Sequence, residues 1–139
     1  MQTNEASAPY RTQANKESHS GAGFRAFLRL ADLWNLSNEE QRILLGQIKR
    51  STFFKWKKQN GVGVELSHDT LERISYLLGI YKALNIIFPD PAIADAWIRQ
   101  PNQAPLFGGR SALERMLSGQ VSDLFLVRQY LDAERGGWG

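Results

Sequence analysis

Basic side chains alternate with aromatic ones in residues 47–60, QIKRSTFFKWKKQN, and this segment has the clearest chemistry in the sequence. It holds five Lys or Arg residues, no acidic residue and three aromatic rings. Ammonium and guanidinium groups bind phosphate, and Arg reads guanine through two parallel hydrogen bonds. The segment therefore has the residue types of a helix that binds DNA.

Within this segment the two sides of the helix have different chemistry. Phe53 and Trp56, three residues apart, are expected to face the core. Arg50 is placed to read guanine. Phe54 lies on the side away from the core and is placed to contact a thymine methyl group. The predicted DNA-binding residues are Lys49, Arg50, Ser51, Thr52, Lys55 and Lys58. The charge run alone also fits a solvated basic helix with no nucleic-acid partner.

Three short predicted helices make a helix-turn-helix around the segment. An apolar stripe at helical spacing, Phe24, Phe27, Leu28, Ala31 and Trp34, predicts the first. Ser37 and Glu40 form a capping-box pattern that starts the second, which ends at Gly46. The third starts at Ser51 or Thr52 and ends at Gly61. The turn after Gly46 is one residue longer than usual, and Arg42 stands where a small residue is common.

Composition excludes several classes of chemistry. The 139-residue chain has no Cys and two His, so it has no thiol nucleophile, no disulfide and no cysteine zinc site. We expect no enzymatic activity, no metal and no cofactor, because no nucleophile, base and orienting group occur together. The net charge of +3 is unevenly distributed along the chain. Residues 1–60 carry +5 and residues 61–139 carry −2.

The rest of the chain is also predicted to be helical, which makes the fold all-α. A long helix spans residues 67–88, and apolar residues on several of its sides place it either at the centre of the fold or at a dimer interface. Further helices are expected at 92–99, after Ser111 with a second capping box at Glu114, and at 121–135. Val62–Leu66 is the sole candidate strand.

The predicted organisation has four parts. Residues 1–22 form a flexible N-terminal arm with few large apolar groups, either a solvated tail or a DNA-contacting arm. Residues 23–66 form the helix-turn-helix, 67–88 the central helix with a dimerisation role, and 89–139 a C-terminal binding region. No signal peptide or membrane span is recognisable, so we expect a cytoplasmic protein without a membrane partner.

Residues 88–119, FPDPAIADAWIRQPNQAPLFGGRSALERMLSG, resemble the Xre/MbcA/ParS-type antitoxins of bacterial type II toxin–antitoxin systems. The resemblance rests on the following residues: Phe88, Pro91, Ala94, Trp97, Pro101, Asn102, Gly108, Gly109, Arg110, Ser111, Leu113, Glu114 and Gly119. With the Xre-like helices it extends over residues 24–135. Ala112 departs from the Pro common at that place, which costs rigidity at the helix start.

The resemblance implies a toxin partner, typically a RES-domain toxin that degrades NAD, whose active site the C-terminal region covers. The residues assigned to toxin binding are Arg110, Arg128, Tyr130, Leu131, Arg135, Trp138 and Gly139. Alternatives stay open: Arg110 either ties backbone groups inside the protein or contacts the toxin, and Trp97 is a core or an interface residue. The tail from Asp132 to Gly139 either enters the toxin's NAD pocket or is a frayed end.

These features lead to one main functional hypothesis and one alternative. The main hypothesis is an antitoxin that neutralises a RES-type toxin and binds operator DNA to autoregulate its operon. It acts as a homodimer within a larger toxin–antitoxin complex, because one recognition helix reads only a half-site. The alternative is a stand-alone helix-turn-helix repressor without a toxin, which leaves the match in residues 88–119 unexplained.

Overall fold

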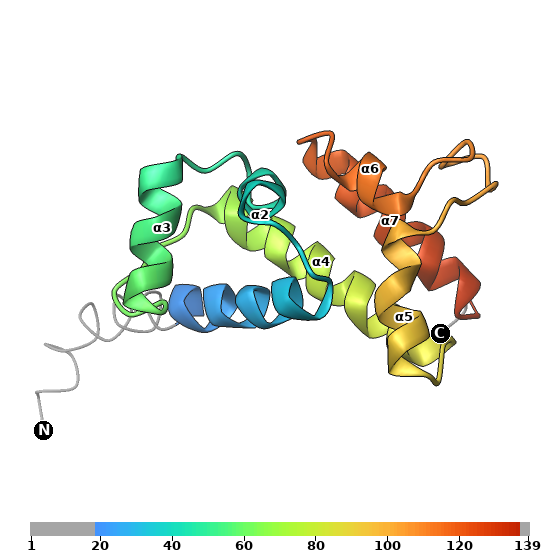
Figure 1. Cartoon of the computed structure of the whole chain (residues 1–139), viewed down its shortest axis with the longest axis horizontal. Coiled ribbons are helices and arrows are strands. Elements are labelled where there is room, and N and C mark those ends of the chain that lie inside the picture. The colour runs from blue at the N-terminus through green and yellow to red at the C-terminus, as the bar shows by residue number, and fades with distance from the viewer. Residues whose placement is uncertain (1–18, 137–139) are drawn as a thin grey trace, which may run out of the picture.

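A computed structural model describes residues 19–136, and this part of the chain is helical (Figure 1). An N-terminal helix occupies residues 19–33. It is followed by α2 (Asn38–Leu44), α3 (Arg50–Gln59), α4 (His68–Ile87), α5 (Pro91–Ala96), the 3-10 helix η1 (Trp97–Arg99), α6 (Ala112–Met116) and α7 (Val121–Glu134). Between residues 19 and 136 the strand-like pairing is limited to one isolated bridge, Pro101 with Ser111. The all-α prediction is confirmed.

Local sequence signals set most helix ends. Ser37 and Glu40 cap α2 reciprocally, and Ser111 and Glu114 do the same for α6, so both predicted capping boxes are present. Ser67 caps α4, which ends before Pro89. The candidate strand at Val62–Leu66 is irregular backbone instead, because glycines at 61 and 63 adopt positive φ and break an extended run.

The predicted boundary of the N-terminal arm needs correction. Residues 19–22 are helical and belong to the helix-turn-helix, because Ser20 is fully buried and its hydroxyl accepts a hydrogen bond of 3.0 Å from the Leu66 amide. The apolar stripe predicted for this helix faces the core. Its buried members are Phe24, Phe27, Ala31 and Trp34. The remainder of the predicted arm, residues 1–18, lies outside the described residues.

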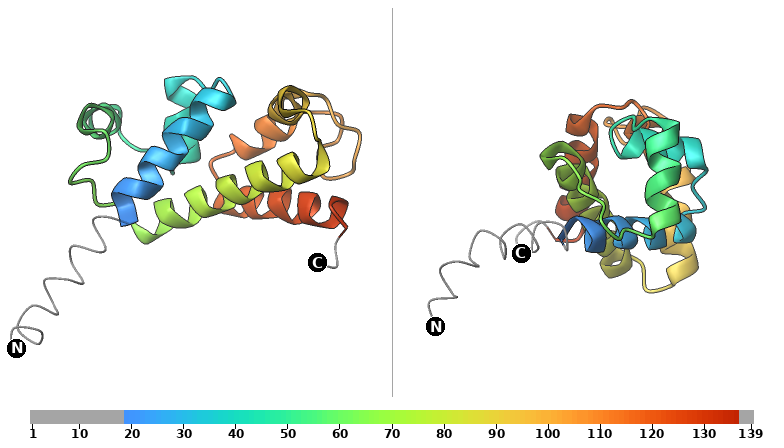
Figure 2. Two further views of the ribbon diagram at one scale, coloured as in Figure 1. Left: turned by 90° about the horizontal axis from the view of Figure 1, so that it is seen from below. Right: turned by 90° about the vertical axis from the view of Figure 1, so that its left-hand side faces the viewer.

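Helix α4 is the spine of the molecule. Figure 2 shows the helix-turn-helix gathered at one end of α4 and α5 to α7 at the other, with α7 running alongside α4. Leu77, Ile80 and Leu84 of α4 are fully buried in one continuous apolar core that includes residues of both halves. Other apolar residues of α4 are half-buried against this core, and Ile86 is 49% exposed.

Arginine side chains also join the two halves. Arg99, at the end of η1, donates to the carbonyl oxygens of Trp34 at 3.2 Å and Asn35 at 2.9 Å, which terminate the N-terminal helix. It lies 3.5 Å from the Glu40 carboxylate of α2. The helix-turn-helix and the C-terminal helices therefore form one body with shared polar contacts as well as a shared core.

Gly61→Ala is expected to lower the free energy of unfolding by about 2–4 kcal/mol, as measured by urea denaturation. Gly61 has φ +82°, and a Cβ there would lie 2.9 Å from the backbone oxygen of Gly21 in the N-terminal helix. Gly63→Ala is the matched control. Gly63 has φ +72°, but a Cβ added there would meet no atom within 4 Å, so only the backbone strain of about 1 kcal/mol applies. Equal losses in the two variants would contradict the contact between Gly21 and Gly61.

Candidate functional site

The exposed face of α3 carries most of the predicted DNA-binding residues. Lys49, Arg50, Ser51, Lys55 and Lys58 are exposed, whereas Thr52 is half-buried at the edge of this face. The opposite side of α3 is held by Phe53, which is fully buried, and by the half-buried Trp56. The structure therefore gathers five of the six residues on one surface.

Phe53 and Trp56 attach α3 to the N-terminal helix through Phe24. The Phe24 ring lies edge-on to both, with ring centroids 6.4 Å from Phe53 and 5.7 Å from Trp56. Lys57 donates a hydrogen bond of 3.0 Å to the side chain of Asn38, which begins α2. These contacts fix the rotation of α3 about its axis and so determine which side chains face outward.

The start of α3 is open to an anion. Lys49 at the N-cap makes no side-chain capping bond, and the first turn contains no acidic residue. The first amide groups of a helix lack intrahelical partners and carry partial positive charge. Together with the neighbouring lysines they suit contact with a phosphate group, as the second helix of a helix-turn-helix requires.

Arg42 holds the long turn between α2 and α3. Its Nε donates to the carbonyl oxygen of Ile48 at 2.7 Å, and its guanidinium pairs with Glu39 at 2.7 Å. The turn reverses through Gly46 and Gln47, whose φ values are +110° and +61°. Arg42, which stands where a small residue is common in this motif, thus closes the extended turn.

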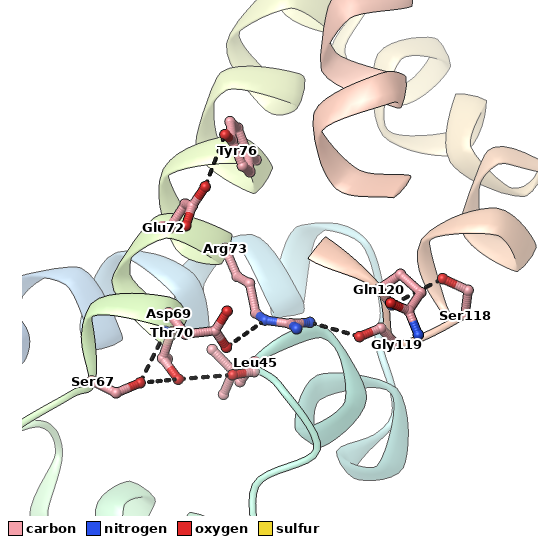
Figure 3. Close-up of polar contacts among 10 residues, drawn as sticks. All are labelled: Leu45, Ser67, Asp69, Thr70, Glu72, Arg73, Tyr76, Ser118, Gly119 and Gln120. Carbon is pink, nitrogen blue, oxygen red and sulfur yellow. Dashed lines mark hydrogen bonds and ion pairs between the residues drawn. The ribbon is translucent and has the colours of Figure 1, made fainter. Parts of the chain in front are cut away.

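A polar network connects this turn to the C-terminal half (Figure 3). Thr70 of α4 donates to the Leu45 carbonyl at 2.9 Å, at the start of the turn. One helical turn further along, Arg73 is only 9% exposed and pairs with Asp69 at 2.8 Å. The Arg73 guanidinium also donates to the Gly119 carbonyl at 3.1 Å, between α6 and α7. Helix α4 is therefore bonded both to the turn that precedes α3 and to the α6–α7 turn.

Arg115 has the internal role that was one of the two alternatives for Arg110. Arg110 is exposed, so the interpretation that it ties groups inside the protein is wrong. Arg115 has that role: it donates to the Leu106 carbonyl at 2.9 Å and pairs with Asp123 at 3.0 Å. Arg110 instead lies at the rim of a cavity of about 320 Å³ next to Phe107 and remains available to a partner.

The predicted toxin contacts on α7 do not share one surface. Leu131 is 1% exposed and belongs to the core, so its assignment as a partner contact is wrong. Tyr130 is half-buried and packs on Phe107 and on Trp97, with ring centroids 5.2 Å and 6.3 Å away. Arg135 is exposed at the end of α7. Trp138 and Gly139 lie outside the described residues.

Arg128 faces the other side of α7 and lies against α4. A Cβ on Gly79 would lie 2.5 Å from the Arg128 guanidinium carbon, so the missing side chain of Gly79 makes room for this cation. Arg128 also lies 3.6 Å from Asp132. With Tyr76, Phe125 and Gln129 these two residues line a cavity of about 330 Å³ between α4 and α7, which we call the α4–α7 cavity.

Phe125 is the large apolar residue of α7 that is most exposed. It is 44% exposed, whereas Leu124 and Val127 are buried. Its ring meets Tyr76 edge-on at 5.8 Å. The hydrogen bond that Tyr76 donates to Glu72, at 3.0 Å, raises the pKa of the Tyr76 hydroxyl, so this group stays neutral at physiological pH. Phe125 and Tyr76 thus form an accessible aromatic pair between α7 and α4.

Among residues 19–136 no group of three or more His, Asp or Glu side chains is arranged to hold a metal ion. The same stretch contains no helix long and apolar enough to cross a membrane.

Comparison with known proteins identifies both halves. The family model for the antitoxin Xre-like helix-turn-helix domain matches residues 13–79. The family model for the antitoxin Xre/MbcA/ParS C-terminal toxin-binding domain matches residues 83–137. An uncharacterized protein of Sinorhizobium fredii, y4oB, is 54% identical over 116 residues, which cover 84% of this chain and 86% of that relative. The two domain matches meet inside α4, the helix that belongs to both halves of the core.

Proposed function

Because this chain belongs to the Xre-type antitoxins, with a helix-turn-helix domain and a C-terminal toxin-binding domain, we propose that it neutralises a RES-type, NAD-degrading toxin and represses its own operon. The RES assignment is supported by the likeness of residues 88–119 to antitoxins whose typical partner is such a toxin. Autoregulation is supported by the outward basic face of α3 in the same chain as the toxin-binding domain. The presence of the basic face of α3 and the toxin-binding domain in one chain is the single observation that carries the proposal.

Operator binding is assigned to the exposed residues of α3 and to the free amides at its start. Lys49, Lys55 and Lys58 neutralise phosphates, which supplies affinity without sequence preference. Arg50 supplies base recognition at the start of the helix. Ser51 adds a hydroxyl for a phosphate or base edge, and Thr52, which is half-buried, contributes less.

A homodimer is proposed because one recognition helix contacts too few base pairs for specific binding, and two half-sites one helical turn apart require two copies. Much of the apolar circumference that suggested α4 as the dimer interface packs against the core of the same chain. Between Thr70 and Ile87 the exposed residues of α4 are Ser75, Lys82 and Ile86. The dimer contact is therefore proposed to involve other elements, with Ile86 as the one large apolar contribution from α4.

Toxin binding is assigned to the C-terminal half, with Arg110, Arg128 and Arg135 as accessible cations. Phe125 beside the α4–α7 cavity is added as an apolar contact to the residues assigned from the sequence. The tail from Asp132 to Gly139, including Trp138, is proposed to reach into or over the NAD pocket of the toxin. Trp is among the residues most often found at interface hot spots, which supports this role.

Co-expression with the adjacent open reading frame tests the proposal. Expression of that frame alone is expected to stop growth and deplete cellular NAD, and co-expression with this chain is expected to restore both and yield a stable complex. If the product of the adjacent frame is harmless and forms no complex with this chain, the stand-alone repressor is the function that remains. A toxic neighbour that does not lower NAD would reject the RES assignment while retaining the antitoxin.

Deletion of residues 136–139 is expected to weaken neutralisation while DNA binding is unchanged. The deletion begins after Arg135, the C-cap of α7, so it removes no part of the described helices. Growth rescue in the co-expression strain and duplex binding of the purified chain are the two measurements. Trp138→Ala in the full-length chain separates the indole from chain length. Full neutralisation by the truncated chain would reject the role of the tail.

A further inference from the structure

Two residues on the outward face of α3 are already in contact with each other. The guanidinium carbon of Arg50 lies 5.3 Å from the centre of the Phe54 ring, and the guanidinium is placed over that ring. The residues are four apart in the helix, so they are neighbours on one face. Both are open to solvent: the Arg50 side chain is 65% exposed and Phe54 is 38% exposed.

Arg50 is held from a second direction by Glu39 of α2. The Glu39 carboxylate lies 3.6 Å from Arg50 and 2.7 Å from Arg42, which itself closes the α2–α3 turn. A guanidinium placed between a carboxylate and an aromatic ring loses less freedom when it forms two parallel hydrogen bonds. Glu39 is therefore a positioning residue for Arg50.

The geometry of this pair spans two neighbouring base pairs. A guanidinium that bonds guanine O6 and N7 lies near the plane of that base. The centre of the Phe54 ring lies 5.3 Å from the Arg50 guanidinium carbon, which is farther than the spacing of about 3.4 Å between neighbouring base pairs. The ring therefore meets the next base pair, where the C5-methyl group of thymine is the apolar feature that the major groove offers.

We infer that Arg50 and Phe54 act as one unit that reads a guanine next to a thymine in the operator. This inference rests on the proposed DNA binding and names the sequence feature recognised. Lys55 and Lys58, on the same face, provide phosphate contacts and do not distinguish bases. The specificity of α3 is thereby assigned to one Arg–Phe pair and its carboxylate support.

The test begins with selection of binding sites for the full-length chain from a randomised DNA duplex library. The selected half-sites are expected to share a G·C pair with a thymine in the adjacent base pair. Exchange of that thymine for uracil removes only the methyl group and is expected to weaken binding about fourfold. Exchange of the guanine for 7-deazaguanine removes the N7 acceptor and is expected to weaken binding about tenfold.

Variants then assign each effect to a side chain. Phe54→Ala is expected to be insensitive to the uracil exchange. Arg50→Ala is expected to be insensitive to the deazaguanine exchange, because alanine has no donor for the N7 acceptor. Glu39→Gln is expected to keep its affinity for unselected duplex while losing most of its preference for guanine. A purely structural role of Glu39 would lower both affinities together. Thermal unfolding of each variant verifies that it folds.

The inference is overturned if no thymine of the selected site responds to uracil, or if Phe54→Ala and the original chain respond equally. Selected sites without a guanine–thymine neighbour would overturn it too. In each of these cases salt-dependent duplex binding would still support the proposed operator binding. A chain that binds no duplex even at about 50 mM salt would reject operator binding itself.

Discussion

Phe53→Ala is expected to lower the free energy of unfolding by about 3–5 kcal/mol, because it removes a fully buried ring from the core. The ring packs on Phe24 and beneath the recognition helix, so the cavity would lie where α3 is attached to the N-terminal helix. We expect the urea midpoint to fall markedly. Specific DNA binding should weaken in parallel, since the orientation of α3 depends on this contact.

Phe54→Ala is the matched control, because it makes the same chemical change at the next residue. Phe54 is exposed and faces outward, so its truncation should change the free energy of unfolding by less than about 1 kcal/mol. Its effect should appear in DNA recognition instead. Equal destabilisation by the two variants would mean that α3 is rotated so that Phe54 also faces the core.

Replacement of Lys49, Lys55 and Lys58 together by glutamine is expected to weaken duplex binding by about two orders of magnitude at about 0.15 M salt. All three are exposed beside the start and outward face of α3. Each phosphate contact releases close to one counterion, so the slope of log affinity against log salt should become shallower by about three. Fluorescence anisotropy titrations across a salt series give both quantities.

Lys82→Gln serves as the control for net charge. Lys82 is an exposed lysine on α4, outside the helix-turn-helix face. Its replacement should leave the salt slope unchanged if affinity arises from defined phosphate contacts. A reduction of the slope by the same amount per lysine in both variants would indicate attraction by overall charge and would contradict a docked α3.

The features that could be predicted are those encoded within a few residues. The capping pairs Ser37 with Glu40 and Ser111 with Glu114 lie three residues apart, and both are present in the structure. The outward position of Phe54 followed from the burial of Phe53 and Trp56. Such features depend on helix geometry alone, so they can be read from the spacing of residues.

The features that were missed depend on how the helices and turns pack, and not on residue spacing within one helix. Arg110 and Arg115 carry the same charge, and only the packing of α6 on α7 brings Arg115 within 3.0 Å of Asp123. Leu131 and Phe125 are both apolar residues of α7, and helical spacing alone does not show which of them is buried. Leu131 is 1% exposed and Phe125 is 44% exposed, a difference set by the packing of α7 and not by the spacing of its residues. Gln47 gives no local signal of its positive φ, which is rare outside glycine.

The sequence by itself determined the helices, the basic face of α3 and the family, because periodicity, caps and residue types act locally. The tertiary structure alone decided how the two working halves are joined. Arg73 reaches a carbonyl 46 residues away at Gly119, and Arg99 reaches one 65 residues away at Trp34. A long flexible cation has many acceptors within reach in an unfolded chain, and only the packed core selects the one that it keeps.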